Sequence, residues 1–90
     1  MYQVMVVDDE PMAASLIVNI IKRKHSNFDI MGTAYDGEEA LELMEKKGEP
    51  DVLITDIQMP VMNGLKLVEE TKKRYPEVLS VIVSGYQEFE

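Results

Sequence analysis

Hydrophobic and polar residues follow one another in blocks that predict four strands separated by three helices. Short apolar runs without strict alternation indicate buried strands at residues 2–7, 28–35, 52–55 and 79–84. Between these runs, apolar residues recur three and four positions apart, which is the period of an amphipathic helix. Strands that alternate with amphipathic helices favour an α/β fold, in which helices cover both faces of a parallel sheet.

Local signals indicate where each helix begins and ends. Pro11 suits the first turn of the first helix, which should end near residues 22–25. Asp36 and Glu39 form a capping-box pattern before the second helix, and Gly48 is placed to end it. Asn63 is the expected cap of the third helix, over residues 64–75. Ala40, Leu41 and Met44 of the second helix are expected to face inward. The apolar residues that recur at helical spacing in the first helix are Met12, Leu16, Ile17, Ile20 and Ile21, and those expected to line one face of the third are Val68, Thr71 and Tyr75.

Acidic residues follow two of the predicted strands. Asp8, Asp9 and Glu10 come directly after the first strand, and Asp56 follows the third. Ligands of a parallel sheet bind beyond the carboxyl ends of its strands. If the first and third strands are neighbours, their carboxylates converge and repel one another. A hard divalent cation relieves that repulsion, and the pattern therefore predicts a Mg²⁺ site.

Each of these residues also has a simpler interpretation. Asp9 or Glu10 could only cap the following helix, and Asp56 could only be a turn residue. Ser84 and Gly85, at the end of the fourth strand, could likewise form only a turn. Because all of these positions are expected at one edge of the sheet, a shared site explains them better than three coincidences.

Composition limits the classes of partner. The chain has 90 residues, a net charge of -8 and a pI of about 4.5, which disfavours nonspecific binding to nucleic acid or to an anionic membrane. It contains no cysteine, so disulfides and thiolate metal sites are excluded. The first residues lack both a membrane-span length of apolar residues and the basic region of a signal peptide. We therefore expect a cytoplasmic protein of one domain.

Three motifs resemble the receiver domain of two-component response regulators: "VVDDEP", "ITDIQMPVMNG" and "VIVSG". The stretch "SGYQEFE" is similar to receivers that occur with AraC-type DNA-binding output domains. The resemblance covers residues 1–90 and implies a flavodoxin-like, doubly wound parallel sheet with strand order 2-1-3-4. The family's fifth strand and last helices would lie beyond Glu90, so we expect a receiver domain that is incomplete at its C-terminus.

The resemblance implies a role for each site residue. Asp56 would accept a phosphoryl group from a sensor histidine kinase. Asp9 and Asp56 would bind Mg²⁺ directly, and Asp8 would act mainly through water. The backbone carbonyl of Gln58 would be a further ligand of the ion.

The implied function is a non-enzymatic signalling domain that controls transcription in the full-length protein. Ser84 would hydrogen-bond the phosphoryl group, and Gly85 would leave room for it. DNA would be bound only by an output domain that this chain does not include, and no membrane partner is implied. The family's lysine on the fifth strand would also lie beyond Glu90, so we expect phosphorylation of this chain to be slow or not detectable.

Two other functions stay open at this point. An Mg²⁺-dependent phosphatase that forms an aspartyl-phosphate usually has a second Asp two residues after its nucleophile, and this chain has Gln58 there. A non-signalling, flavodoxin-like binding domain would need a phosphate-binding loop rich in Ser, Thr and Gly after the first strand. The acids of "DDEP" would repel a phosphate in that place.

The fourth predicted strand raises the question of self-association. Leu79–Ser84 is apolar and free of charge and proline, and the order 2-1-3-4 leaves it at the edge of the sheet. The neighbouring sheet face would also be uncovered, beside the helix that carries Leu16 and Ile20. We therefore expect a homo-oligomer, formed by edge pairing at residues 81–83 or by packing of the uncovered faces.

Overall fold

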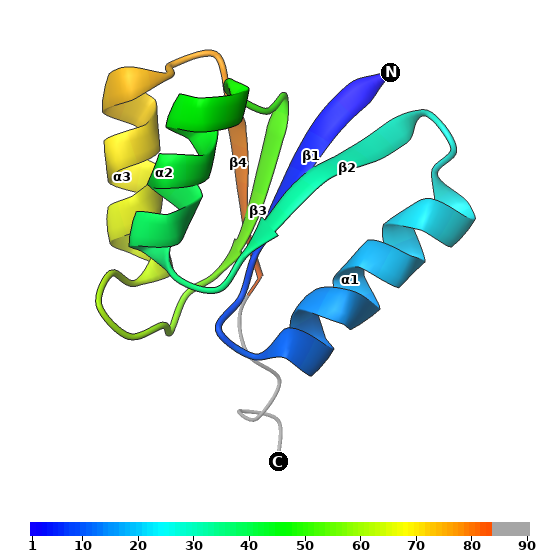
Figure 1. Cartoon of the computed structure of the whole chain (residues 1–90), viewed down its shortest axis with the longest axis horizontal. Coiled ribbons are helices and arrows are strands. Elements are labelled where there is room, and N and C mark those ends of the chain that lie inside the picture. The colour runs from blue at the N-terminus through cyan, green and yellow to red at the C-terminus, as the bar shows by residue number, and fades with distance from the viewer. Residues whose placement is uncertain (84–90) are drawn as a thin grey trace.

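A computed structural model describes residues 1–83, which form one parallel sheet between two layers of helices (Figure 1). The strands are β1 (Tyr2–Val7), β2 (Phe28–Ala34), β3 (Val52–Asp56) and β4 (Leu79–Val83). The helices are α1 (Pro11–Lys24), α2 (Gly37–Lys47) and α3 (Gly64–Arg74). The strand order is β2-β1-β3-β4, and all three pairings are parallel. The fold class and the order 2-1-3-4 are confirmed.

The core is divided by the sheet into two clusters. Met5 and Val7 of β1 pack with Leu53, Met44 and Leu67 under α2 and α3. The alternate residues of β1, Val4 and Val6, pack with Ala14 and Ile21 of α1 on the opposite face. Because successive residues of a strand point to opposite faces, only a strand covered on both sides is apolar throughout. This is the reason why β1 could be recognised from its sequence.

Helix α1 forms as its apolar spacing predicts, but only part of that apolar pattern packs on the sheet. Met12, Leu16 and Ile20 lie on one stripe of the helix and are 85%, 59% and 39% exposed. The stripe that packs on the sheet contains Ala14, Ile17, Val18 and Ile21 instead. The helix has two apolar stripes, and the periodicity alone does not say which of them faces the sheet.

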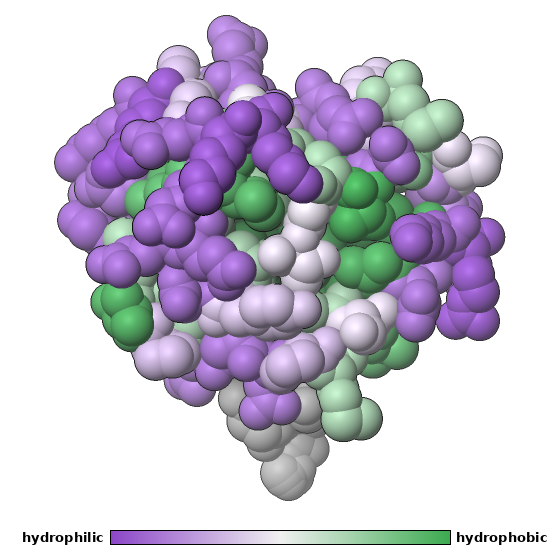
Figure 2. All heavy atoms as spheres, in the orientation of Figure 1, coloured by the Kyte–Doolittle hydropathy of each residue, from purple (hydrophilic) through white to green (hydrophobic). Residues whose placement is uncertain are grey.

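Strand β4 adds exposed apolar residues on the α1 side of the sheet. Val81 is the register partner of Ile54, which packs with the α1 cluster, so both side chains lie on this face. Val81 and Leu79 are 40% and 63% exposed. Figure 2 shows a face of the molecule that is mostly hydrophilic, with some hydrophobic residues exposed near its centre.

The ends of α2 follow the predicted local signals. The Asp36 carboxylate accepts a hydrogen bond from the Glu39 amide at 2.8 Å. Glu39 reaches back as expected, but its carboxylate accepts from the Tyr35 amide, at 2.8 Å, and not from that of Asp36. Gly48 has φ of 96°, which an L-residue rarely adopts, and it ends the helix.

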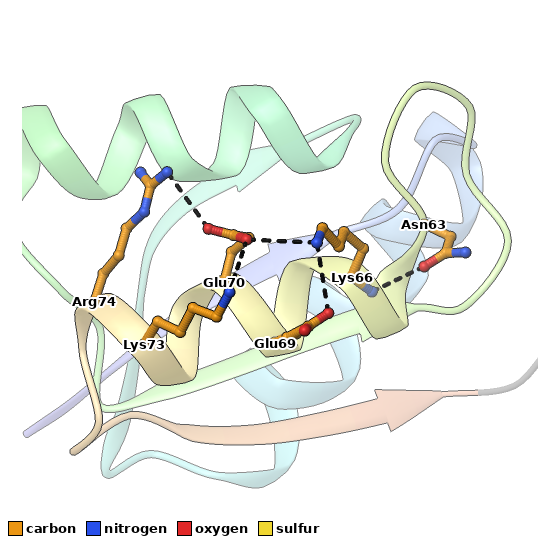
Figure 3. Close-up of polar contacts among 6 residues, drawn as sticks. All are labelled: Asn63, Lys66, Glu69, Glu70, Lys73 and Arg74. Atoms are coloured by element: carbon orange, nitrogen blue, oxygen red, sulfur yellow. Dashed lines mark hydrogen bonds and ion pairs between the residues drawn. The ribbon is translucent and has the colours of Figure 1, made fainter.

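Helix α3 begins at its predicted cap and ends one residue early. The Asn63 side chain accepts a hydrogen bond from the Lys66 amide at 2.9 Å (Figure 3). Leu67 is fully buried, whereas Val68, predicted to share a face with Thr71 and Tyr75, is half-buried. On the outer face, the Glu70 carboxylate lies 3.6–3.8 Å from three cationic side chains (Figure 3). Such exposed pairs contribute little to stability, and this face is a solvent-facing surface.

Candidate functional site

The acidic residues meet at the carboxyl ends of β1 and β3. These two strands are direct neighbours, and Val7 is the register partner of Thr55. Asp8 and Asp9 follow β1, while Asp56 is the last residue of β3. One carboxylate oxygen from each of the three lies within 4.8 Å of the other two. The sequence predicted that these carboxylates would converge if the first and third strands were neighbours, and both the strand order and the convergence are observed.

The three carboxylates differ in their surroundings. Asp8 is 7% exposed, and Asp9 and Asp56 are half-buried. One oxygen of Asp8 accepts from the Glu10 amide at 3.0 Å, and one oxygen of Asp56 accepts from the Ile57 amide at 2.8 Å. Burial raises the pKa of Asp8, the hydrogen bond from Glu10 partly opposes this, and the charges of Asp56 and Asp9 raise it further. A bound cation would offset the cost of burying the charged Asp8 carboxylate and the repulsion among the three carboxylates.

The helix-cap interpretation of Glu10 is wrong. Glu10 occupies the position before α1, but its side chain makes no capping hydrogen bond. Instead, the Asp8 carboxylate accepts from the Glu10 amide at the entrance to the helix. This bond uses one Asp8 oxygen, and the carboxylate keeps further lone pairs for a ligand.

The loop after β3 forms one wall of the site. Its residues Ile57, Gln58, Met59, Pro60 and Asn63 line, together with Asp9, an open depression of about 620 Å³. The Gln58 side chain is exposed, and Met59 is 9% exposed and belongs to the core. The depression is therefore bounded on one side by Asp9, which follows β1, and on the other by residues 57–63, named the acceptor loop after the role that the resemblance implies for Asp56.

Gly64 has a different role from the one expected. A glycine that follows a loop and a helix cap could simply let the chain turn, but Gly64 lacks the positive φ that such a turn would need. A Cβ at this position would clash with the carbonyl oxygen of Asp56, and the Gly64 amide donates to the Ile57 carbonyl at 2.7 Å. The glycine is required because the start of α3 touches the backbone of Asp56.

Two predicted site residues, Ser84 and Gly85, lie outside the described residues. Thr55 is a neighbour of the site that the sequence analysis missed. It is fully buried, and its hydroxyl donates to the Asp56 carbonyl at 3.0 Å. A hydroxyl residue within the apolar run before Asp56 was the available signal, because a buried hydroxyl needs a partner.

Comparison with known proteins agrees with this geometry. Residues 4–90 match the response regulator receiver domain family. The chain is 34% identical, over all 90 residues, to the uncharacterized transcriptional regulatory protein YesN of Bacillus subtilis (strain 168), of which it covers 24%. It spans only about a quarter to a third of the curated relatives it matches.

Solved structures show the same fold. The REC domain of AraT, a response regulator from Geobacillus stearothermophilus, matches 98% of this chain with 67% of its own length, at 35% identity and a TM-score of 0.85. The two-component transcriptional regulator AraC from Clostridium phytofermentans ISDg matches 99% of this chain with 71% of its own length, at 34% identity and a TM-score of 0.83. Within residues 1–83, no helix is long and apolar enough to cross a bilayer.

Proposed function

Because the chain belongs to the response regulator receiver domain family, we propose that it accepts a phosphoryl group on Asp56 from a sensor histidine kinase. The observation that carries the proposal is the meeting of three carboxylate oxygens within 4.8 Å at the carboxyl edge of β1 and β3. Asp56 is the member of this group that lies beside the acceptor loop. Its side chain is half-buried, so part of it remains accessible to a phosphoryl donor.

The donor set of this edge fits Mg²⁺. Asp8, Asp9 and Asp56 offer hard oxygen ligands, and the Gln58 backbone carbonyl is a further candidate. Burial of Asp8, and to a lesser extent repulsion by Asp56 and Asp9, raises the pKa of Asp8 and disfavours three ionised carboxylates without a cation. When bound, Mg²⁺ would neutralise charge on the phosphoryl oxygens during transfer.

The chain's own residues would position the nucleophile. The Ile57 amide holds one Asp56 oxygen, and among the described residues no hydrogen bond engages the other. That second oxygen would attack phosphorus, forming an O–P bond as the N–P bond of the phosphohistidine breaks and its electron pair returns to the imidazole. Ser84 would then hydrogen-bond the transferred group, and Gly85 would leave room for it.

The output of this step would be control of transcription in a longer protein, exerted in the cytoplasm. YesN and the AraC regulator are described as transcriptional regulators, and the chain matches only part of each. DNA would accordingly be bound by an output domain outside residues 1–90. Neither alternative function gains support from the site: Gln58 still occupies the place of a phosphatase's second Asp, and three acids would repel a cofactor phosphate.

The test uses chelator-treated 90-residue protein and two matched variants. Asp56→Asn removes the acceptor, and Asp51→Asn changes an exposed Asp at the opposite end of β3. We expect Mg²⁺ to raise the melting temperature of the wild type and of Asp51→Asn, but much less that of Asp56→Asn. Beryllofluoride should add to the rise only in the presence of Mg²⁺.

Phosphorylation is measured by intact mass after treatment with acetyl phosphate. Wild type and Asp51→Asn should gain one phosphoryl group, slowly, and Asp56→Asn should gain none. Equal labelling of Asp56→Asn would exclude Asp56 as the acceptor. A folded wild type whose melting temperature does not respond to Mg²⁺ would exclude the metal site.

A further inference from the structure

The acceptor loop contains a strained turn. Val61 has φ of 71°, and it is the only non-glycine residue within positions 1–83 with a positive φ. The Met62 amide donates to the Pro60 carbonyl at 2.7 Å, two residues back, so Val61 is the central residue of a γ-turn of the rare, strained form. A β-branched residue is especially disfavoured in this region. Neighbouring contacts must therefore hold the turn.

The Val61 side chain does not supply those contacts, because it is 74% exposed. On the near side of the turn, Met59 is 9% exposed within the core. At the far end, the Gly64 amide closes the loop on the Ile57 carbonyl at 2.7 Å. These two anchors leave the segment between Pro60 and Asn63 to be held by Met62.

The Met62 side chain packs against Gly37, the first residue of α2. A Cβ built on Gly37 would lie only 2.8 Å from the Cβ, Cγ and Sδ atoms of Met62. The Met62 side chain also packs against the core cluster under α2 and α3. Gly37 is buried and does not have a positive φ, so its backbone does not require glycine. What requires glycine is the close approach of the loop.

We propose that the contact between Met62 and Gly37 is a clamp that holds the acceptor loop in its strained turn, and that Gly37 is a positioning residue for the site at Asp56 and Gln58. The relevance to metal binding rests on the proposed function, but the clamp itself does not. It links the start of α2, which contributes no ligand, to the loop that lines the depression beside Asp9.

The direction in which Gly37→Ala changes the stability of the protein separates this proposal from an effect of helix propensity alone. Alanine is a better helix former than glycine, so propensity alone predicts that Gly37→Ala stabilises the protein. The clamp predicts the opposite, because the new methyl group meets the Cβ of Met62, which cannot move without its backbone. Gly32→Ala is the matched control, since its Cβ would lie 2.8 Å from Leu43 Cδ2, the far end of a flexible side chain.

The experiment first compares amide resonances of metal-free wild type, Gly37→Ala and Gly32→Ala. Gly37→Ala should shift the resonances of residues 57–64, and Gly32→Ala should not. Mg²⁺ titration should show affinity weakened on the order of tenfold by Gly37→Ala, which is typical for groups that orient a metal ligand. The melting temperature should fall in Gly37→Ala.

Val61→Gly completes a double-mutant cycle. Glycine adopts the turn without strain, so the loop should depend less on the clamp, and Gly37→Ala should weaken Mg²⁺ binding less in this background. If Gly37→Ala does not fold, Met62→Ala, which removes the clamp without a clash, should show the same loop shifts. A more stable Gly37→Ala with unmoved loop resonances would overturn the clamp. If the wild type binds no Mg²⁺, the metal site fails, and the metal-free resonances still decide the clamp.

Discussion

Replacing Asp8 by Asn should stabilise the metal-free protein while weakening its response to Mg²⁺. Asp8 is 7% exposed, and its carboxylate lies within 4.8 Å of those of Asp9 and Asp56. Asn keeps the shape of the side chain and an oxygen that can accept from the Glu10 amide. The substitution therefore removes one buried charge from a group of three and changes little else.

The size of the effect follows from the geometry. Two unit charges about 5 Å apart repel by roughly 3 kcal/mol at an effective dielectric constant of about 20. Partial exposure of Asp9 and Asp56, together with salt, reduces the net gain to about 1–2 kcal/mol. In a chain of this size each kcal/mol raises the melting temperature by about 4–8 °C. Asp8→Asn should therefore melt on the order of 5–10 °C above the wild type in chelator at pH 7.

The stability difference between Asp8→Asn and the wild type should depend on pH in a definite direction. Burial raises the pKa of Asp8, so the native state binds this proton more readily than the unfolded state does. The contribution of Asp8 to stability therefore falls as pH rises above the ordinary carboxyl pKa of about 4. Asp8→Asn lacks this titration. The difference between the two proteins should be greatest near pH 7 and should close as pH falls toward about 4.

The assay is thermal unfolding followed by circular dichroism, in chelator and in Mg²⁺, across this pH range. Asp51→Asn is the control, because Asp51 is exposed and far from the site in the sheet. Saturation at 100 times Kd stabilises the wild type by about 2.7 kcal/mol, and Asp8→Asn should gain less. The reasoning is refuted if metal-free Asp8→Asn is no more stable than the wild type at pH 7. It is also refuted if the difference in melting temperature between the two proteins does not change with pH.

Three further predictions concern packing, capping and association. Gly64→Ala should destabilise the fold by about 1–3 kcal/mol in urea unfolding, because its Cβ meets the Asp56 carbonyl; an unchanged midpoint would contradict that contact. Asn63→Ala should cost about 1 kcal/mol through loss of the bond to the Lys66 amide, whereas Asn63→Asp should cost less. The 90-residue chain should sediment as an oligomer at micromolar concentration, and Val81→Lys on its exposed edge should shift it toward monomer; a monomeric wild type would contradict the predicted self-association.

The number and order of the secondary-structure elements were determined by the sequence itself. Hydrophobic period and end signals are local properties, and they placed all seven elements to within about a residue. The caps at Asp36 and Asn63 are equally local, since each side chain bonds an amide three residues away. The acids after β1 and β3 could also be read directly, and resemblance to a family supplied the strand order that brings them together.

Tertiary structure alone decided which surfaces and backbones meet. The exposed stripe of α1, with Leu16, could not be told from the packed stripe, because both are apolar and helical in period. Gly37 and Gly64 look like ordinary turn or helix-start glycines, yet Gly37 is required by the Met62 side chain and Gly64 by the backbone of Asp56. The positive φ of Val61 contradicts its own local preference and exists only because flanking contacts outweigh it. Close approach between distant segments leaves no periodic trace in a sequence, which is why the shape of the acceptor loop appeared only in the folded chain.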